Sequence, residues 1–368
     1  MPPEAASTES ARWLGDIFVA RLVSGIVEGL RVSAGLISLE HGGDLALARE
    51  HFPDCVEPLV DLSTGINPDA YPLPKLAPDS FARLPQPEAL ERLAAAAAAA
   101  YAAPSIHTVV PAPGTQILLP ATAALRPPGR AAVLGPTYAE HMRVASLVGH
   151  RAEEVADVAS LAQADLAYVV NPNNPDGRLL AREALLAIAD ELRSHGGILV
   201  VDEAFMDVAG SEMSLARDVG CGNIVVLRSF GKFFGLAGLR LGFALAAPEL
   251  AARLKAWLGP WPVAGAAIAI GVAALADREW AQSTRTSLKS SAQRLDEILA
   301  ACGRLEIVGG TSLFRLAHTS AAMEIYRHLG RAGIFVRRFA EHPEWLRFGL
   351  PGCEGAWTRL RAALAQLA

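Results

Sequence analysis

The middle of the chain alternates short apolar runs with segments in which apolar residues recur at helical spacing. Each run is followed by a turn rich in glycine, proline or asparagine. Continuously apolar strands that alternate with helices are typical of a mostly parallel sheet covered by helices on both faces. The runs that predict strands are HTVV (107–110), AAVLG (131–135), LAYVV (166–170), GILVVDEAF (197–205), NIVVLRS (223–229) and LRLGFAL (239–245).

After residue 245 the pattern becomes helical, and it stays helical to about residue 301. Short apolar runs then return, and the chain ends in a helical segment. This change predicts a second, smaller α+β domain that follows a long connecting helix. The later runs are LEIVG (305–309), SLFRLA (312–317), GIFVRRF (333–339) and WLRFGL (345–350).

The same patterns divide the chain into segments. Apolar positions within 12–38 recur at helical spacing, so we expect an amphipathic helix there, packed on the domain or on a partner subunit. The predicted segments are an N-terminal extension (1–40), an arm rich in proline, glycine and aspartate (41–85), a large α/β domain (86–276), the connecting helix (277–304) and a small C-terminal domain (305–368).

Composition narrows the classes of function. Hydrophobic residues make up 52% of the 368 residues and charged residues 19%, as in a globular protein. The formal net charge is −5, and basic and acidic residues are mixed along the chain, which argues against nucleic-acid binding. We find neither a run long enough for a membrane span nor a secretory signal, so we expect a cytoplasmic protein. The four cysteines lack metal-binding spacing, and we expect no metal site.

The unusual residues of the sequence follow the predicted strands, where ligands bind in parallel α/β sheets. Gly114 and Thr115, in APGTQ (112–116), indicate either an anion site at a helix start or a simple turn with an N-cap. Tyr138, in GPTYAEH (135–141), either lays its ring against a planar ligand or packs in the core.

Two further strand ends carry polar groups in unusual settings. Asn174 lies in NPNNPDG (171–177), where two prolines stiffen a polar loop. Its amide either bonds a ligand oxygen or serves a structural loop. Asp202 ends a strand that we expect to be buried on both faces, where a carboxylate is costly unless it is paired. Its partner is either a ligand cation or a structural arginine.

The stretch VLRSFGKFFGLAGLRLGF (226–243) holds a lysine among small and aromatic residues. Lys232 has phenylalanines on both sides, so burial is expected to disfavour its charged form and make it a nucleophile toward aldehydes. Ser229 and Arg240 can both reach a phosphate, and the fork of Arg240 fits phosphate oxygens.

Together these groups describe a ligand with a planar aromatic ring, a phosphate, an aldehyde and a protonatable ring nitrogen, which are the parts of pyridoxal 5′-phosphate (PLP). Lys232 would bond the aldehyde carbon, and Asp202 would keep the ring nitrogen protonated, so that the ring withdraws electrons from the bond that breaks. Tyr138 would stack on the ring, and Asn174 would bond the ring hydroxyl. The phosphate would be held by Gly114, Thr115, Ser229 and Arg240.

The order of NPNNPDG, DEAF and RSFGKFFGLAGLRLGF resembles fold-type I PLP enzymes of the aspartate aminotransferase superfamily, over about residues 41–368. Within it, HGGDLALARE (41–50) and DLSTGINPDAYP (61–72) are most similar to the threonine-phosphate decarboxylases of cobalamin biosynthesis. Histidinol-phosphate aminotransferases are close relatives. The resemblance implies a homodimer with shared active sites that acts on a phosphorylated amino acid. Its reaction would convert O-phospho-L-threonine to (R)-1-aminopropan-2-yl phosphate.

The resemblance also implies which residues contact the substrate. Arg347, in WLRFGLP, would bind the α-carboxylate of the substrate. Arg337, in GIFVRR, would bind the phosphate of the substrate together with the HGG segment at His41, Gly42 and Gly43.

Two more residues take their expected roles from the resemblance. Tyr71 would reach the cofactor phosphate of the partner subunit. Many relatives have tyrosine where Phe205 stands, so the bond from that hydroxyl to the ring oxygen is expected to be absent here. Decarboxylation and transamination use the same lysine and aspartate, so a histidinol-phosphate aminotransferase stays an alternative. A non-catalytic binding protein with this fold is a further alternative, against which intact Lys232 and Asp202 argue.

Overall fold

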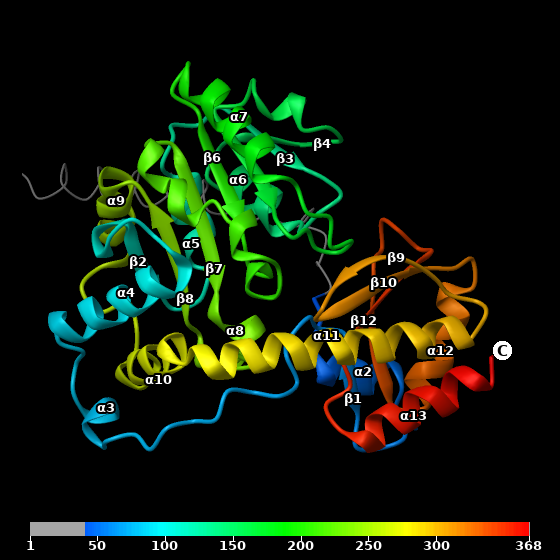
Figure 1. Cartoon of the computed structure of the whole chain (residues 1–368). Helices are drawn as coiled ribbons and strands as arrows, with labels where there is room; N and C mark the ends of the chain where they lie inside the picture. Colours follow the sequence, from blue (N-terminus) through cyan, green and yellow to red (C-terminus); the bar gives the residue numbers. More distant parts are fainter. Residues whose placement is uncertain (1–40, 368) are drawn as a thin grey trace, which may run out of the picture. The chain divides into compact units, whose positions relative to one another are not determined.

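The computed structural model describes residues 41–367, which include a seven-stranded and a five-stranded sheet (Figure 1). The amphipathic helix expected within 12–38 lies outside the described residues.

The seven-stranded sheet is mostly parallel, as predicted. Only β8 runs antiparallel, and it lies between β7 and β2. The edge strand β4 was not predicted, because RAEEV is polar and partly exposed. The strands, in their order across the sheet, are β2 (Val109–Ala112), β8 (Gly242–Ala246), β7 (Ile224–Ser229), β6 (Ile198–Asp202), β5 (Leu166–Val170), β3 (Arg130–Leu134) and β4 (Arg151–Val155).

The sheet is buried on both faces, which explains why its strands are continuously apolar. Along β6, Leu199 and Val201 belong to one buried cluster, whereas Ile198 and Val200 belong to another. Alternate side chains of a strand point to opposite faces, so each face has a core of its own. The helices of this part are α3 (Asp79–Ala82), α4 (Pro87–Tyr101), α5 (Leu118–Ala123), α6 (Glu140–Leu147), α7 (Arg182–Arg193), α8 (Phe230–Phe233), α9 (Pro248–Leu258) and α10 (Gly265–Ala276).

The five-stranded sheet combines the C-terminal strands with a short strand from the arm. Strand β1 (Val60–Leu62) pairs parallel with β11 (Ile334–Arg338), so part of the arm belongs to this sheet. The other strands are β12 (Trp345–Gly349), β10 (Phe314–His318) and β9 (Glu306–Thr311). The accompanying helices are α2 (Leu45–His51), α12 (Ala322–Arg331) and α13 (Glu354–Ala365).

A 24-residue helix, α11 (Arg278–Ala301), connects the two sheets, close to the predicted range (Figure 1). It packs on β9, β10 and α13, while Arg285 Nε donates to the Asp207 carbonyl at 2.7 Å. The loop after β5 also touches β9, since Gly310 N donates to Asp176 O at 2.7 Å. These contacts hold the two sheets at the position where their polar loops meet.

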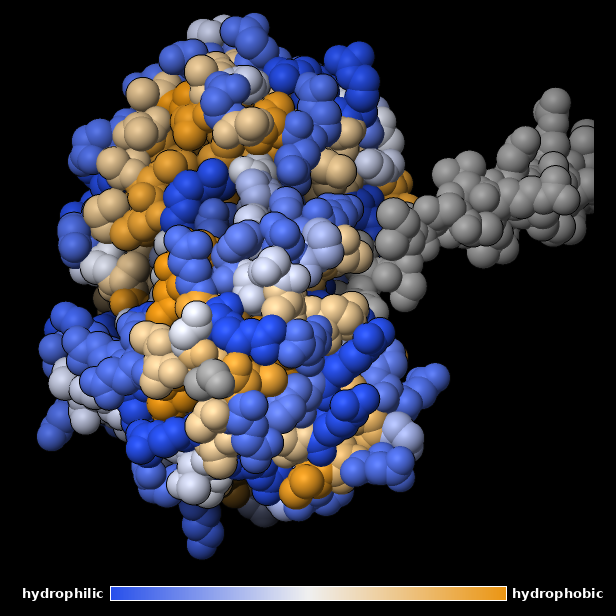
Figure 2. Space-filling view, turned by 90° about the vertical axis from the view of Figure 1, so that its right-hand side faces the viewer, coloured by the Kyte–Doolittle hydropathy of each residue, from blue (hydrophilic) through white to orange (hydrophobic). Residues whose placement is uncertain are grey.

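The surface is mixed in character. On the face shown in Figure 2, hydrophobic residues form small groups among hydrophilic ones. None of the helices within 41–367 combines the length and the apolarity needed to span a bilayer.

Candidate active site

Strand pairing brings the ends of β7 and β2 together around the start of β8. Ser229 pairs with Gly242, and Gly242 pairs with Ala112. A Cβ atom on Gly242 would lie 2.8 Å from the backbone nitrogen of Thr115, so glycine is required for this approach. The register therefore places the Gly114–Thr115 loop beside Ser229.

The guanidinium of Arg240 lies beside the Gly114–Thr115 loop. A Cβ on Gly114 would lie 2.6 Å from Arg240 Nη2, and Gly114 has φ +85°, which favours glycine. The helix that we expected to open here begins only at Leu118. The hydroxyl of Ser229 makes no hydrogen bond with the described residues, so it is available to an anion held by Arg240.

Lys232 lies in α8, directly after the end of β7, and its side chain is half-buried. Its Nζ is 5.8 Å from the centre of the Phe205 ring. Burial, followed by the cations of Arg347 and Arg240, lowers the pKa of Lys232 to about 8, while Asp202 acts in the opposite direction. At neutral pH a larger fraction of this amine is neutral than in an ordinary lysine, and the neutral amine can act as a nucleophile.

Asp202 ends β6 and is paired with a histidine, not with an arginine. Its Oδ2 is 3.0 Å from His141 Nε2, and its Oδ1 accepts from Ala204 N at 3.1 Å. The side chain of His141 is completely buried, and its ring stands edge-on to Tyr138 with centres 5.8 Å apart. Sequence reasoning missed His141. Its signal was its place three residues after Tyr138, at the start of the helix that follows, where His141 N donates to Tyr138 O at 3.3 Å.

The loops after β3 and β5 brace each other. Thr137 Oγ1 donates to Asn173 Oδ1 at 2.6 Å, and Asn173 Nδ2 donates to Pro136 O at 2.9 Å. Tyr138 is half-buried, its hydroxyl donates to Gln116 at 3.2 Å, and burial raises its pKa to about 12. Tyr138 and the half-buried Asn174 therefore project from a stiff frame.

Arg347 of β12 reaches the frame from the smaller sheet. It is buried, and it donates to Asn174 Oδ1 and, at 2.8 Å, to the carbonyl of Ser63. Its Nε has no hydrogen-bond partner in the part of the chain that the structure describes. Burial lowers the pKa of Arg347 to about 9, with a further effect of Arg337, so it stays a cation at neutral pH.

Arg337 and the arm lie beside this arginine. Arg337 pairs in register with Arg347, on neighbouring strands. Gly43 N donates to Ser63 Oγ at 2.7 Å, and a Cβ on Gly42 would lie 2.3 Å from Ser63 O. Ser63, which sequence reasoning also missed, therefore joins the HGG segment to Arg347. His41 precedes this contact in the chain and is exposed.

Tyr71 and Phe205 are both buried. The Tyr71 hydroxyl donates to Asp277 Oδ2 at 3.2 Å within its own chain, and its ring packs edge-on against Trp280. Burial, with Asp277, raises the pKa of Tyr71. Its expected contact with a partner subunit stays a prediction. Phe205 packs on Phe314, with ring centres 5.1 Å apart, and offers no hydroxyl to a ligand.

These residues fit PLP. The amine of Lys232 forms no hydrogen bond or ion pair with residues 41–367, although its surroundings disfavour its charge. The same strand ends also carry the carboxylate of Asp202, the Gly114–Thr115 loop with Arg240 beside it, and the half-buried Tyr138. An aldehyde at Lys232, a ring nitrogen at Asp202 and a phosphate at Gly114 and Arg240 would each meet a complementary group.

The chain is similar to known proteins over most of its length. The model of a family described as aminotransferase class I and II matches residues 58–359. A threonine-phosphate decarboxylase of Pseudomonas aeruginosa is 41% identical, over 89% of this chain and 97% of the relative. A histidinol-phosphate aminotransferase of Mycobacterium bovis is 37% identical, over 57% and 59%. The crystal structure of histidinol-phosphate aminotransferase from Sinorhizobium meliloti in complex with pyridoxal-5′-phosphate has a TM-score of 0.74 at 22% identity, over 90% of this chain and 95% of that chain.

Proposed function

The chain belongs to the class I and II aminotransferase family, and on that premise we propose that it decarboxylates O-phospho-L-threonine to (R)-1-aminopropan-2-yl phosphate. Family membership confirms the predicted fold and the predicted cofactor, PLP. The observation that supports O-phospho-L-threonine as the substrate is the 41% identity to a threonine-phosphate decarboxylase, over 89% of this chain and 97% of the relative. Two histidinol-phosphate aminotransferases are less similar, one at 37% identity over 57% of this chain and another at 32% over 84%. The product is the amino alcohol phosphate that cobalamin biosynthesis uses.

The cofactor would be held by the strand ends described above. When bound, PLP supplies an electron sink that stabilises the electron pair left on the substrate when a bond to Cα breaks. Asp202, fixed by His141, would keep a proton on the ring nitrogen, because a carboxylate nearby favours the cationic form. Arg240 and Ser229 would bind the phosphate, and the ring of Tyr138 would restrict the plane of the cofactor.

The substrate would be held by two cations. Arg347 has a buried Nε without a partner within the described range, and a carboxylate is the group that an arginine fork binds best. Arg337, in register with Arg347, would bind the phosphate of the substrate with the HGG segment. Two anionic groups of one small molecule then meet two guanidinium groups on neighbouring strands.

Lys232 would also move the proton that replaces the carboxylate. Its Nζ has a pKa of about 8, so at neutral pH it can both release and accept a proton. Nζ would hold this proton and donate it to Cα of the substrate, where it takes the place of the carboxylate. The same side chain would thus serve first as the attachment point and then as the general acid.

We further propose a cytoplasmic homodimer. Leu73, Phe81 and Leu84 follow Tyr71 and are 64%, 72% and 59% exposed, and a second subunit covering this segment would bury them. Tyr71 would then lie near the partner's cofactor phosphate. Sedimentation at micromolar concentration tests the dimer. The variant F81D, at the most exposed of these positions, is expected to shift the protein toward monomer.

The cysteines support the cytoplasmic location. The four cysteines form no disulfide in the described chain, which suits a reducing compartment.

A product assay on the purified PLP-loaded protein tests the function. O-phospho-L-threonine and histidinol phosphate would be supplied separately, each with and without 2-oxoglutarate. We expect carbon dioxide and aminopropanol phosphate from phosphothreonine, with no requirement for the oxo acid. Glutamate that appears only when 2-oxoglutarate is present would overturn the decarboxylase in favour of an aminotransferase, which is the second candidate.

A further inference from the structure

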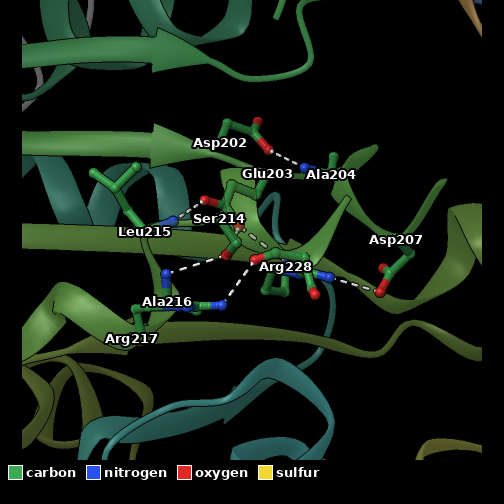
Figure 3. Close-up of polar contacts among 10 residues, drawn as sticks. Asp202, Glu203, Ala204, Asp207, Ser214, Leu215, Ala216, Arg217 and Arg228 are labelled. Carbon is green, nitrogen blue, oxygen red and sulfur yellow. Dashed lines mark hydrogen bonds and ion pairs between the residues drawn. The ribbon is translucent and has the colours of Figure 1, made fainter. Parts of the chain in front are cut away.

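A group of buried charges lies between the ends of β6 and β7, next to the candidate site (Figure 3). Arg228 donates from Nη1 to Glu203 Oε2 at 3.0 Å and from Nη2 to Asp207 Oδ1 at 2.6 Å. All three side chains are at least nine-tenths buried. Burial raises the pKa of Glu203, and the charge of Arg228 opposes this effect. The candidate site uses none of these three groups.

The buried charges also bind the loop that follows β6. Glu203 Oε2 accepts from Ser214 Oγ at 2.6 Å, and Oε1 accepts from Leu215 N at 2.8 Å (Figure 3). Ser214 Oγ in turn accepts from Ala216 N at 3.1 Å. The guanidinium of Arg228 lies 4.2 Å from the centre of the Tyr101 ring. One carboxylate therefore fixes the loop that follows Phe205 to the end of β6.

Each charged member is adjacent in sequence to a residue of the cofactor site. Glu203 follows Asp202, and Arg228 precedes Ser229. Neighbouring residues of an extended chain point to opposite sides, so the same two backbone segments carry the network on one side and the cofactor groups on the other. Backbone pairing reinforces this, since Glu203 N donates to Leu227 O at 2.9 Å.

A further contact leads from the network to the helix of Lys232. The carbonyl of Asp207 accepts from Arg285 Nε at 2.7 Å. The guanidinium of Arg285 lies 5.2 Å from the ring centre of Phe233, the residue after Lys232. Arg285 therefore connects the backbone of Asp207 to α8.

Net stability does not explain this arrangement. The desolvation of buried ion pairs costs about as much as their attraction returns, and apolar residues of similar volume often stabilise a fold equally well. What an arginine held by two carboxylates adds is a fixed geometry between the chain segments that carry them.

We propose that Glu203, Arg228 and Asp207 are positioning residues that fix Asp202 relative to Ser229 and Lys232. They act on the cofactor without touching it: they set the separation between the group for the ring nitrogen and the groups for the aldehyde and the phosphate. The proposal rests on the cofactor assignment of the proposed function and not on the identity of the substrate.

The test compares R228K with a variant that neutralises the whole network, E203Q/D207N/R228M. R228K keeps the charge but loses the fork that bonds both carboxylates. The readouts are the dissociation constant for PLP, the wavelength and pH titration of its visible absorption band, and the urea midpoint of the PLP-free protein. We expect both variants to bind PLP about 10-fold more weakly and to shift the band, with a urea midpoint close to wild type for R228K.

The control is R130Q/E153Q, which removes an ion pair between the start of β3 and the middle of β4 in the same sheet. It should leave the PLP affinity and the band unchanged. Wild-type affinity and an unchanged band in R228K would overturn the proposal, and this holds even if the neutral variant does not fold. The variant K232A separates the assumptions: if it retains the visible band, the cofactor assignment fails and not the positioning role.

Discussion

Replacing Lys232 by methionine is expected to stabilise the PLP-free protein at neutral pH. Burial, with the nearby cations of Arg347 and Arg240, lowers the pKa of Lys232 from 10.5 to about 8. In the unfolded chain the amine regains its ordinary affinity for protons. The gap between the two values corresponds to about 3 kcal/mol by which the charged lysine destabilises the folded state. Methionine has a similar length and carries no charge.

The pH dependence separates this charge effect from packing. Below about pH 8 the amine is protonated in both states, so the whole penalty applies. Between pH 8 and 10.5 the folded protein holds a neutral amine while the unfolded chain still binds a proton, so the stability of the wild type rises with pH. At pH 9.5 the penalty is about 1.4 kcal/mol. Any gain from better packing of methionine is the same at both pH values.

Urea unfolding of the PLP-free wild type and K232M at pH 7 and pH 9.5 measures the difference. The control is K289M, which removes an exposed lysine of α11. We expect K232M to be more stable than wild type, with an advantage about 1.5–2 kcal/mol larger at pH 7 than at pH 9.5, and K289M to show no such change. An advantage of equal size at both pH values would refute the reasoning that burial of this charge makes the lysine reactive.

Three other predictions concern groups around Lys232. H141N should weaken PLP binding and lower kcat about 10-fold or more, because Asp202 loses its buried partner; unchanged constants would contradict the pairing. G114A should raise the dissociation constant for PLP about 10-fold, since Gly114 has φ +85°, which disfavours a residue with a Cβ, and Arg240 would have to move; G220A, with open space around it, should not. R347K should raise KM for phosphothreonine about 10-fold or more with little effect on PLP affinity; an unchanged KM would exclude carboxylate binding at Arg347.

The strands of the large sheet could be predicted because burial on both faces leaves a continuous apolar run. LAYVV (166–170) was found at its observed bounds, and the other runs were found to within a few residues. Strand β4 and strand β1 were missed for the opposite reason. The first is polar at the edge of the sheet. The second is short and pairs with β11, as Val60 with Ile334, across a distance in sequence over which no local pattern extends.

Site residues could be predicted from the sequence where their neighbours along the chain are unusual. The side chains that they contact in the folded protein could not be predicted in this way. Lys232 stands out because phenylalanines flank it, and Asp202 because it ends a buried strand. The identity of the partner depends on contacts between distant segments. Sequence reasoning allowed a structural arginine beside Asp202, yet the partner is His141, and the arginine of this region, Arg228, binds the neighbouring Glu203. One residue along a strand reverses the side on which a carboxylate lies.

The reaction is determined by how the substrate is held rather than by the groups that attack it. The bond to Cα that breaks would be selected by how the residues of the site orient the substrate. A substrate attached through its nitrogen alone can turn about that bond, and a single arginine narrows the rotation. Arg337 and Arg347 in register on β11 and β12 would hold two anionic groups together and so leave one orientation. In the proposed function Lys232 and Asp202 would serve decarboxylation and transamination alike, so the positions of the two arginines would have to select the substituent that is lost. On this proposal the groups that select the substrate, Arg337 and Arg347, come from the small sheet, whereas Lys232 and Asp202 come from the ends of strands of the large one.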